Sequence, residues 1–397
     1  MPSPSNRINN LSESQTIAMS RKSRELKAQG IDIINLSLGE PDFDTPQIIK
    51  DSAKKAIDQN FTQYTDVSGY LELRESISQK FKRDNNLDYT AEQIVVSTGA
   101  KQSIANVILT MINPGDEVIV PAPYWVSYIE LIKLAEGVPI IIKCGLDQDF
   151  KITPAQLRSA ITPKTKMLIL STPCNPTGSV YSRDELKAIA QVVAEFSELY
   201  ILSDEIYEHI NFVGGHESIA QFDFIKDRVI TINGVSKSFA MTGWRVGFMG
   251  APVWIAKACD KLQGQITSNT SSISQKATQT AMEMDPQTIQ PMRDEFKKRR
   301  DLVLDLMRQI PGLKTNTPQG AFYIFPDITY YFGKSDTTTT INNSIDLCSY
   351  ILDHAHVALV PGSAFGDDNY IRLSYAVSQD KLTEALSRIK KALALLK

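Results

Sequence analysis

One lysine of the sequence stands where its side chain could do covalent chemistry. Lys237 lies between Ser236 and Ser238, in a turn that follows the apolar run Arg228–Ile232. A neutral lysine amine forms a Schiff base with an aldehyde, and pyridoxal phosphate (PLP) is the commonest aldehyde cofactor. PLP also requires a cation and hydroxyls around its phosphate, and Ser236 and Arg245 stand close by in the sequence. An isolated Ser-Lys-Ser is usually a solvated loop, so the interpretation depends on the other residues.

The pyridine ring of PLP requires a carboxylate that keeps its nitrogen protonated, and the sequence provides one upstream. Asp204 ends the apolar run Tyr200–Asp204, and Tyr207 follows, where it is expected to bond the phenolic oxygen of the cofactor. Asn175 stands in a turn after a second apolar run, Lys166–Thr172. These side chains complete the polar surroundings that a PLP ring needs.

In their order and distances, Asn175–Gly178, Asp204–Tyr207 and Ser236–Arg245 resemble the class I/II aminotransferases of PLP fold type I. The resemblance covers nearly the whole chain. It implies that Lys237 binds PLP covalently and then moves a proton on the substrate, with Asp204 and Tyr207 as the other catalytic residues. The cofactor-binding residues that it implies are Tyr64, Gly99, Ala100, Lys101, Trp125, Asn175, Asp204, Tyr207, Ser236, Lys237 and Arg245.

Arg372 is the main candidate for substrate recognition. It lies in the alternating run Tyr370–Ala376, where a solvent-facing edge charge is the ordinary alternative. A planar guanidinium binds a carboxylate through two parallel hydrogen bonds, and the family places this arginine on the α-carboxylate of the amino acid. The substrate-binding residues that the resemblance implies are Ser14, Thr16, Gly39, Lys101, Trp125, Asn175 and Arg372.

Lys101 and the Ser14-Gln-Thr16 segment resemble the bacterial aspartate aminotransferase branch, of aspartate/prephenate type. There a lysine and hydroxyls meet the distal carboxylate of the substrate. The resemblance implies ping-pong transfer of the amino group of L-aspartate to 2-oxoglutarate, which gives oxaloacetate and L-glutamate. It also implies a homodimer in which Tyr64 reaches the cofactor phosphate of the neighbouring subunit.

Other functions remain open at the level of sequence. Nothing in the sequence separates aspartate from prephenate or aromatic substrates. A PLP lyase or synthase on the same fold would share most of the cofactor residues. A non-catalytic regulator with an aminotransferase-like domain is disfavoured, because the enzyme fold accounts for the whole chain. The four histidines show no catalytic pattern.

The elements that must position these residues follow an α/β pattern. Short apolar strands such as Glu117–Val120 alternate with amphipathic helices, which predicts a mostly parallel sheet with helices on both faces. Ligands in such sheets bind at the carboxyl ends of the strands, where Asn175, Asp204 and Lys237 fall. Gly99 opens a helix that runs to about Ile112, and a helix N-terminus suits a phosphate.

The chain divides into a large and a small domain by pattern. We expect an N-terminal arm over residues 1–46 that belongs to the small domain, a large PLP-binding domain over 47–290, and a small C-terminal domain over 291–397. Beyond Pro311-Gly312 the hydrophobic pattern changes to that of short strands and helices. The small domain is therefore predicted to be α+β and built from both chain ends.

Composition excludes several classes of partner. The 397 residues carry a net charge of −3 with acids and bases interspersed, so neither nucleic acid nor a membrane surface is an expected partner. The cysteines, Cys144, Cys174, Cys259 and Cys348, have no paired spacing, which argues against a metal site or a disulfide framework. We therefore expect a reduced, cytoplasmic enzyme that acts on small amino and 2-oxo acids.

Overall fold

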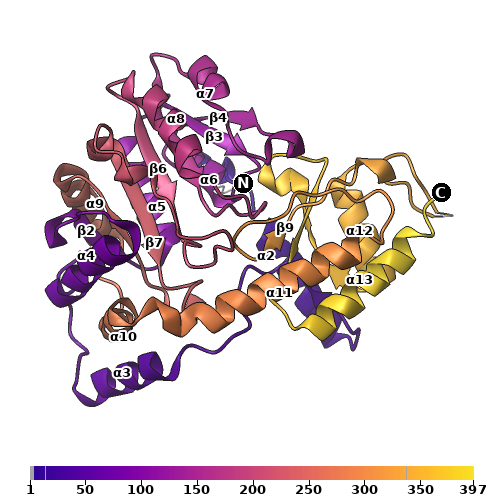
Figure 1. Cartoon of the computed structure of the whole chain (residues 1–397), viewed down its shortest axis with the longest axis horizontal. Helices are drawn as coiled ribbons and strands as arrows, with labels where there is room; N and C mark the ends of the chain where they lie inside the picture. The colour runs from indigo at the N-terminus through magenta and orange to yellow at the C-terminus, as the bar shows by residue number, and fades with distance from the viewer. Residues whose placement is uncertain (1–3, 14, 337) are drawn as a thin grey trace.

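The computed structural model describes residues 4–13, 15–336 and 338–397. Figure 1 shows a larger part, which contains the main sheet, and a smaller part at the other end of the long axis, where the C-terminus lies. The long helix α11 (Gln290–Met307) runs from the larger part into the smaller one.

A seven-stranded sheet forms the centre of the larger part. In spatial order its strands are β2 (Ile94–Ser97), β8 (Gly247–Gly250), β7 (Val229–Gly234), β6 (Tyr200–Asp204), β5 (Thr165–Ser171), β3 (Glu117–Ala122) and β4 (Val138–Lys143). Only β8 runs antiparallel to its neighbours. The central strands are almost continuously apolar and buried, as expected for parallel strands covered on both faces.

Helices cover both faces of this sheet and enclose two apolar cores. The core on one face includes Phe81 and Leu186, and the core on the other includes Ile104 and Ile255. The helices that supply the first core are α3 (Gln47–Asp58), α4 (Leu71–Asn85), α7 (Pro154–Ala160), α8 (Arg183–Ala194) and α10 (Ser272–Glu283). Those that supply the second are α5 (Ala100–Met111), α6 (Ser127–Leu134) and α9 (Val253–Ile266). The predicted α/β architecture is confirmed.

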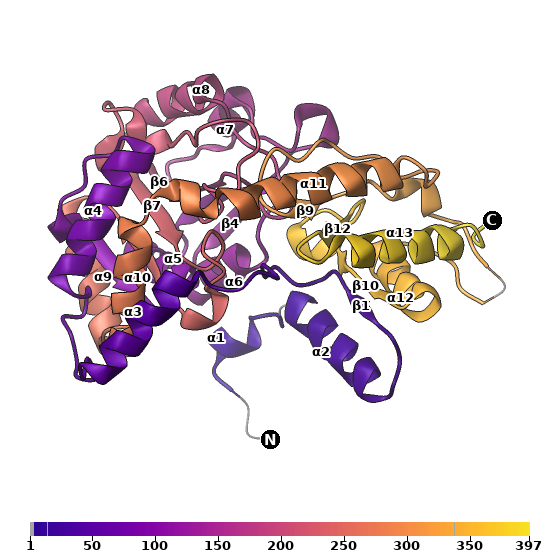
Figure 2. The ribbon, with the colours of Figure 1, turned by 60° about the horizontal axis from the view of Figure 1, so that its bottom comes forward.

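The smaller part joins segments from both ends of the chain. The N-terminal strand β1 (Ile34–Asn35) pairs in parallel with β10 (Val357–Ala358). Beside them lies an antiparallel sheet of β11 (Val360–Pro361), β12 (Ile371–Ser374) and β9 (Tyr323–Ile324). The helices of this part are α2 (Gln15–Ala28), α11, α12 (Ser344–Ala355) and α13 (Gln379–Leu393), and Figure 2 shows α2 beside β10 and α12. The short α1 (Asn6–Asn9) contacts α6 instead.

Local sequence signals explain where several helices begin. Thr153 and Ser182 cap α7 and α8, each accepting a hydrogen bond from the backbone N–H three residues later. The apolar run over residues 31–38 is typical of a longer strand, but only Ile34–Asn35 pairs with β10. Strand β8 was not predicted, since its glycine-rich sequence lacks a β pattern. A Cβ at Gly247 would lie 2.1 Å from the Ala100 nitrogen, so close packing against α5 requires glycine there.

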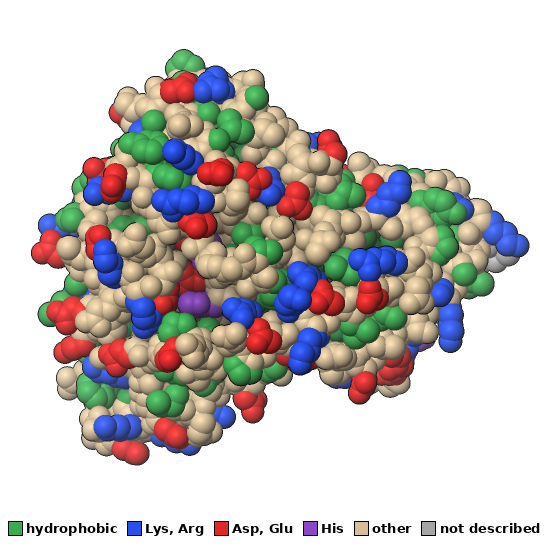
Figure 3. Space-filling model, in the orientation of Figure 1, with side chains coloured by type: hydrophobic (Ala, Val, Ile, Leu, Met, Phe, Trp, Pro, Cys, Tyr) green, Lys and Arg blue, Asp and Glu red, His purple; other side chains and the backbone are tan. Residues whose placement is uncertain are grey.

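The surface matches the even charge balance of the sequence. Figure 3 shows Lys and Arg side chains next to Asp and Glu over the face that it presents, without a broad patch of one sign. Among the described residues, no helix is both long and apolar enough to cross a membrane.

Candidate active site

One pocket collects nearly all of the predicted site residues. It lies at the carboxyl ends of β5, β6 and β7, next to β9 and β12 of the smaller part, and has a volume of about 320 Å³. The predicted residues that line it are Thr16, Gly39, Ala100, Lys101, Trp125, Asn175, Asp204, Tyr207, Ser236, Lys237, Arg245 and Arg372. Residues from both parts of the molecule therefore face one cavity.

Lys237 is half-buried in this pocket without a carboxylate partner within ion-pair distance among the described residues. Its Nζ donates a hydrogen bond to the Gly39 carbonyl at 2.5 Å and lies 6.0 Å from the centre of the Tyr207 ring. Burial lowers the pKa of Lys237 to about 8, and the positive charges of Arg372 and Arg245 act in the same direction. The neutral amine that Schiff-base chemistry requires is thus accessible near neutral pH.

Asp204 ends β6 with its carboxylate in the pocket and is 5% exposed. Tyr128 Oη donates to its Oδ2 at 2.6 Å, and the Ile206 N–H donates to its Oδ1 at 3.3 Å. Burial raises the pKa of Asp204 to about 6, while the Tyr128 hydrogen bond opposes that shift. The carboxylate is therefore ionised at neutral pH and can pair with a protonated ring nitrogen.

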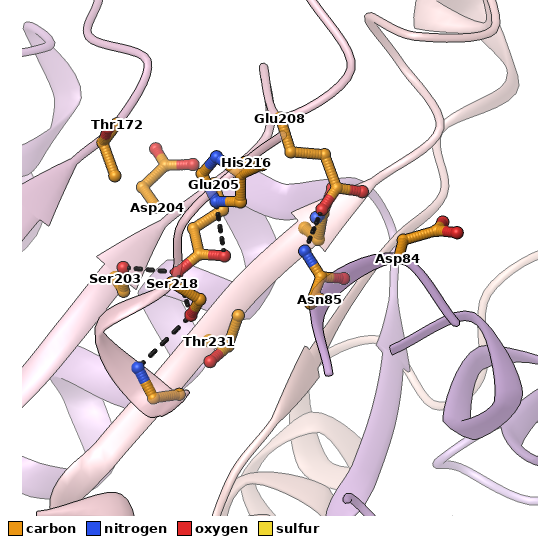
Figure 4. A network of polar contacts seen from close by, with 12 residues as sticks. Asp84, Asn85, Thr172, Ser203, Asp204, Glu205, Glu208, His216, Ser218 and Thr231 are labelled. Carbon is orange, nitrogen blue, oxygen red and sulfur yellow. Dashed lines mark hydrogen bonds and ion pairs between the residues drawn. The ribbon is translucent and has the colours of Figure 1, made fainter. Parts of the chain in front are cut away.

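Glu205, the next residue, points to the other side of the strand. Its carboxylate accepts hydrogen bonds from Ser203 Oγ at 2.8 Å, Ser218 Oγ at 2.7 Å and His216 Nε2 at 2.9 Å. Figure 4 shows this network beneath the carboxyl end of β6, with Asp204 directed away from it. Alternation along the strand thus separates the pocket carboxylate from a structural one.

A second polar cluster adjoins this network. Glu208 pairs with Lys80 and accepts a hydrogen bond from Asn85 Nδ2 at 2.7 Å, and His209 Nε2 lies 3.1 Å from the same carboxylate. The geometry of Asp84, Glu208 and His209 would suit a metal ion. Since both oxygens of Glu208 already have protein partners, we interpret the cluster as a buried ion-pair network.

The predicted phosphate end of the pocket is formed by the N-terminus of α5 and by Arg245. Gly99 caps α5 with φ +86°, and a Cβ there would lie 2.4 Å from Arg245 Nη2. The Arg245 guanidinium donates to the Thr242 carbonyl at 3.0 Å, and Ser236 faces the same pocket. The first amides of a helix lack intrahelical partners and carry the positive end of its dipole. Together with a guanidinium and a hydroxyl they fit a phosphate group.

Arg372 lies in β12 and is only 2% exposed, so the alternative of a solvent-facing edge charge is wrong. Its Nη1 donates to Asn175 Oδ1 at 3.1 Å and its Nη2 to the Ser37 carbonyl at 2.5 Å. Its Nε is buried without a hydrogen-bond partner among the described residues, and the rings of Tyr323 and Phe365 lie 4.6 and 5.0 Å from the guanidinium. A buried unpaired guanidinium calls for an anionic ligand.

Lys101 provides a further cation in the same pocket. Its Nζ lies 5.0 Å from the centre of the Trp125 ring, and burial followed by the charge of Arg245 lowers its pKa. No carboxylate lies within ion-pair distance of Lys101 among the described residues. Thr16 lines the pocket as predicted, whereas the predicted Ser14 lies outside the described residues.

Two tyrosines of the pocket were missed at the level of sequence. Tyr323 Oη shares a hydrogen bond of 2.7 Å with Tyr207 Oη, and a Cβ at Gly39 would lie 2.2 Å from Tyr323 Oη. Tyr128 binds Asp204. The spacing of three residues between Trp125 and Tyr128 was the only signal for the latter. Tyr64 is 92% exposed and does not line this pocket of its own chain.

Known proteins resemble this chain over nearly its whole length. Residues 31–389 match the family model described as aminotransferase class I and II. A bifunctional aspartate aminotransferase and glutamate/aspartate-prephenate aminotransferase of Petunia hybrida is 47% identical over 396 residues, 98% of this chain and 83% of the relative. An aspartate/prephenate aminotransferase of Nitrosomonas europaea is 44% identical over 98% of this chain and 99% of its own.

Solved structures resemble the whole chain. The aspartate aminotransferase of Rhizobium meliloti superposes with a TM-score of 0.97 at 40% identity and full coverage of both chains. The aspartate aminotransferase of Thermus thermophilus with maleate has a TM-score of 0.93 at 37% identity, over 99% of this chain and 100% of the other.

Proposed function

The chain belongs to the class I and II aminotransferases, and from that premise we propose that it transfers the amino group of L-aspartate to 2-oxoglutarate with PLP as its cofactor. The products are oxaloacetate and L-glutamate. The relatives named above as aspartate or aspartate/prephenate aminotransferases support this substrate pair.

The charge of the pocket carries the proposal. Among the described residues, the lining contributes the cations Lys101, Lys237, Arg245 and Arg372 but only one carboxylate, Asp204. In a PLP complex Arg245 would face the phosphate, Asp204 the ring nitrogen, and Lys237 the aldehyde. Lys101 and Arg372 then remain for two further anions. A substrate with two carboxylates, such as aspartate or 2-oxoglutarate, would neutralise both of these cations.

The residues present fit PLP. When bound, PLP supplies an aldehyde that captures amino groups and a protonated ring that withdraws electrons from the substrate's α-carbon. The helix start at Gly99 and Ala100, with Ser236 and Arg245, would hold its phosphate. Trp125 would cover the ring face.

Lys237 is the residue that moves protons in this proposal. Its Nζ takes the proton from the α-carbon of the substrate and later donates it again, which its lowered pKa permits near neutral pH. Arg372 orients the α-carboxylate through its guanidinium, with Asn175 fixing Nη1. Tyr207, whose hydroxyl shares a hydrogen bond with that of Tyr323, would bond the phenolic oxygen of the cofactor.

Prephenate is a second candidate amino acceptor, because the relatives from Petunia hybrida and Nitrosomonas europaea carry that activity in their names. Prephenate also has two carboxylates, so the same two cations suit it. Lys101 and Arg372 therefore support a dicarboxylate substrate, and both 2-oxoglutarate and prephenate are dicarboxylates.

We further propose that the enzyme acts as a cytoplasmic homodimer. Tyr64 is 92% exposed, so its side chain does not pack within its own subunit. A hydroxyl that reaches the cofactor phosphate of a neighbouring subunit accounts for its position. The four cysteines are all free and buried, which suits a reducing compartment.

Initial-rate kinetics test the proposed reaction. L-Aspartate and 2-oxoglutarate are varied together on the PLP-loaded protein, and oxaloacetate and glutamate are measured. We expect parallel double-reciprocal lines, as in ping-pong kinetics, and no turnover by the Lys237→Ala variant. Prephenate then replaces 2-oxoglutarate as acceptor in a matched series. Absence of oxaloacetate with every acceptor would refute the proposal.

A further inference from the structure

Tyr128 touches two of the groups that the proposed function assigns to the cofactor ring. It lies in α6, is 2% exposed, and lines the pocket. Its hydroxyl donates to Asp204 Oδ2 at 2.6 Å. Its ring packs edge-on against Trp125, with centroids 5.3 Å apart and an interplanar angle of 80°. One side chain thus contacts both the ring-nitrogen partner and the residue expected on the ring face.

Asp204 depends on this hydroxyl to remain ionised. Among the described residues, no lysine or arginine lies within ion-pair distance of its carboxylate, and its other donor is the Ile206 N–H at 3.3 Å. Burial favours the neutral acid, whereas a hydroxyl that donates to the carboxylate favours the charged form. Tyr128 is the largest influence that lowers the pKa of Asp204.

The other charges around Asp204 do not replace Tyr128. Glu205, the residue after β6, raises the pKa of Asp204, although its carboxylate is directed away and bonded to His216. The positive charge of Lys237 favours the ionised form less than the hydrogen bonds do. The Tyr128 hydroxyl therefore contributes most to keeping the Asp204 carboxylate ionised.

We propose that Tyr128 is a positioning residue for amino transfer, which keeps Asp204 ionised through its hydroxyl and seats Trp125 through its ring. This inference rests on the proposed PLP function. With the Tyr128 donor in place, an ionised Asp204 would hold the proton on the ring nitrogen of a bound cofactor. Without that donor, the Asp204 carboxylate would compete for the proton and the ring would withdraw electrons less strongly.

The first test measures the protonation state of the ring itself. Wild-type protein and the Tyr128→Phe variant are loaded with PLP labelled with ¹⁵N in its ring, and the ¹⁵N resonance is recorded. Phenylalanine keeps the packing against Trp125 and removes only the hydroxyl. We expect the wild-type resonance at the protonated position and that of Tyr128→Phe shifted toward unprotonated pyridine. The Asp204→Asn variant, which alters the same hydrogen bond from the other side, should shift it too.

A matched control removes a tyrosine hydroxyl elsewhere. Tyr89 Oη bonds Thr231 Oγ1 at 2.9 Å on the neighbouring strand and does not line the pocket. Tyr89→Phe should leave the resonance unchanged. A Tyr128→Phe resonance at the wild-type position overturns the inference alone, whereas a wild-type protein that takes up no PLP overturns the proposed function with it.

Kinetics provide the second test. Tyr128→Phe should lower kcat by about tenfold or more, the effect of losing a hydrogen bond to a charged group, with KM for the amino acid little changed. In an Asp204→Asn background the same substitution should have almost no further effect, because it acts through the carboxylate. Equal losses of kcat in both backgrounds would contradict the role of Tyr128.

Discussion

At the residue scale, burial and charge set the protonation of Lys237 before any ligand binds. The pKa of Lys237 falls to about 8, first because it is buried and then because Arg372 and Arg245 repel its positive form. Only the neutral amine attacks an aldehyde. We therefore expect the rate at which cofactor-free protein captures PLP to rise with pH through a midpoint near 8 and to level off above it.

Stopped-flow absorbance of PLP uptake between pH 6 and about 10.5 measures this dependence. A lysine exposed to water would still gain neutral fraction up to the top of that range. If the uptake rate kept rising through pH 10, the lowered pKa of Lys237 would be incorrect.

Arg372 offers a prediction about substrate recognition. Arg372→Lys keeps one positive charge but loses the fork that bonds Asn175 and Ser37. A lost hydrogen bond to a charged group costs about 1.5 to 3 kcal/mol, so kcat/KM for aspartate should fall by about 10- to 150-fold. PLP affinity, measured by fluorescence titration, should not change. A variant with wild-type kcat/KM would remove Arg372 from the substrate site.

The sequence revealed some of these residues more readily than others. Lys237 and Asp204 stand in motifs whose spacing is itself informative. Tyr323 stands in the continuous apolar run over residues 321–325, where nothing distinguishes a pocket residue from a core residue. Its contact with Tyr207 joins residues 116 positions apart, and only folding brings them together.

At the element scale, the start of α5 must leave room for Arg245. Gly99 has φ +86°, and a Cβ would lie 2.4 Å from Arg245 Nη2. Gly99→Ala should therefore displace the guanidinium from the helix start and weaken PLP binding by about tenfold or more. Equilibrium titration with PLP measures the change.

Gly115 is a matched control for this substitution. It has φ +87°, but a Cβ there would meet nothing within 4 Å. Gly115→Ala introduces the same backbone strain away from the pocket, so it should lower stability without changing the Kd for PLP. Equal losses of PLP affinity in both variants would show that strain alone, rather than the Arg245 contact, is responsible.

Elements were predictable where their hydrophobic period was strong. Helix α8 begins after its Ser182 cap and buries Leu186, Ile189 and Val193, as the capping residue and the apolar spacing indicate. The bounds of β1 and the existence of β8 were not predictable, because a strand of two residues and a strand bounded by glycines carry little periodic signal. Tertiary pairing with β10 and close packing against α5 determine them instead.

At the scale of the whole molecule, the pocket lies where the two parts meet. Arg372 comes from the smaller part, whereas Asp204 and Lys237 come from the main sheet. The N-terminal arm contributes Gly39 and Thr16 to the same cavity. Any shift of the smaller part relative to the sheet would therefore change the distance between the carboxylate-binding arginine and the reactive lysine.

The proposed homodimer gives a prediction at this scale. The protein should sediment at twice the 44.2 kDa of one chain. Tyr64→Phe should raise the Kd for PLP by up to about tenfold, because a hydroxyl is lost from the neighbouring phosphate site, and should leave the dimer intact. Tyr330→Phe, at another exposed tyrosine, is the control. Unchanged PLP affinity in Tyr64→Phe would separate Tyr64 from the cofactor.

In the proposed reaction, the pocket first accepts the amino group of aspartate. PLP-loaded protein is mixed with L-aspartate in the absence of any 2-oxo acid, and the products are quantified after a single turnover. We expect about one oxaloacetate per chain, no free ammonia, and conversion of the bound cofactor to its amino form, as seen by absorbance. Release of ammonia or pyruvate, or a cofactor spectrum that does not respond to aspartate, would contradict it.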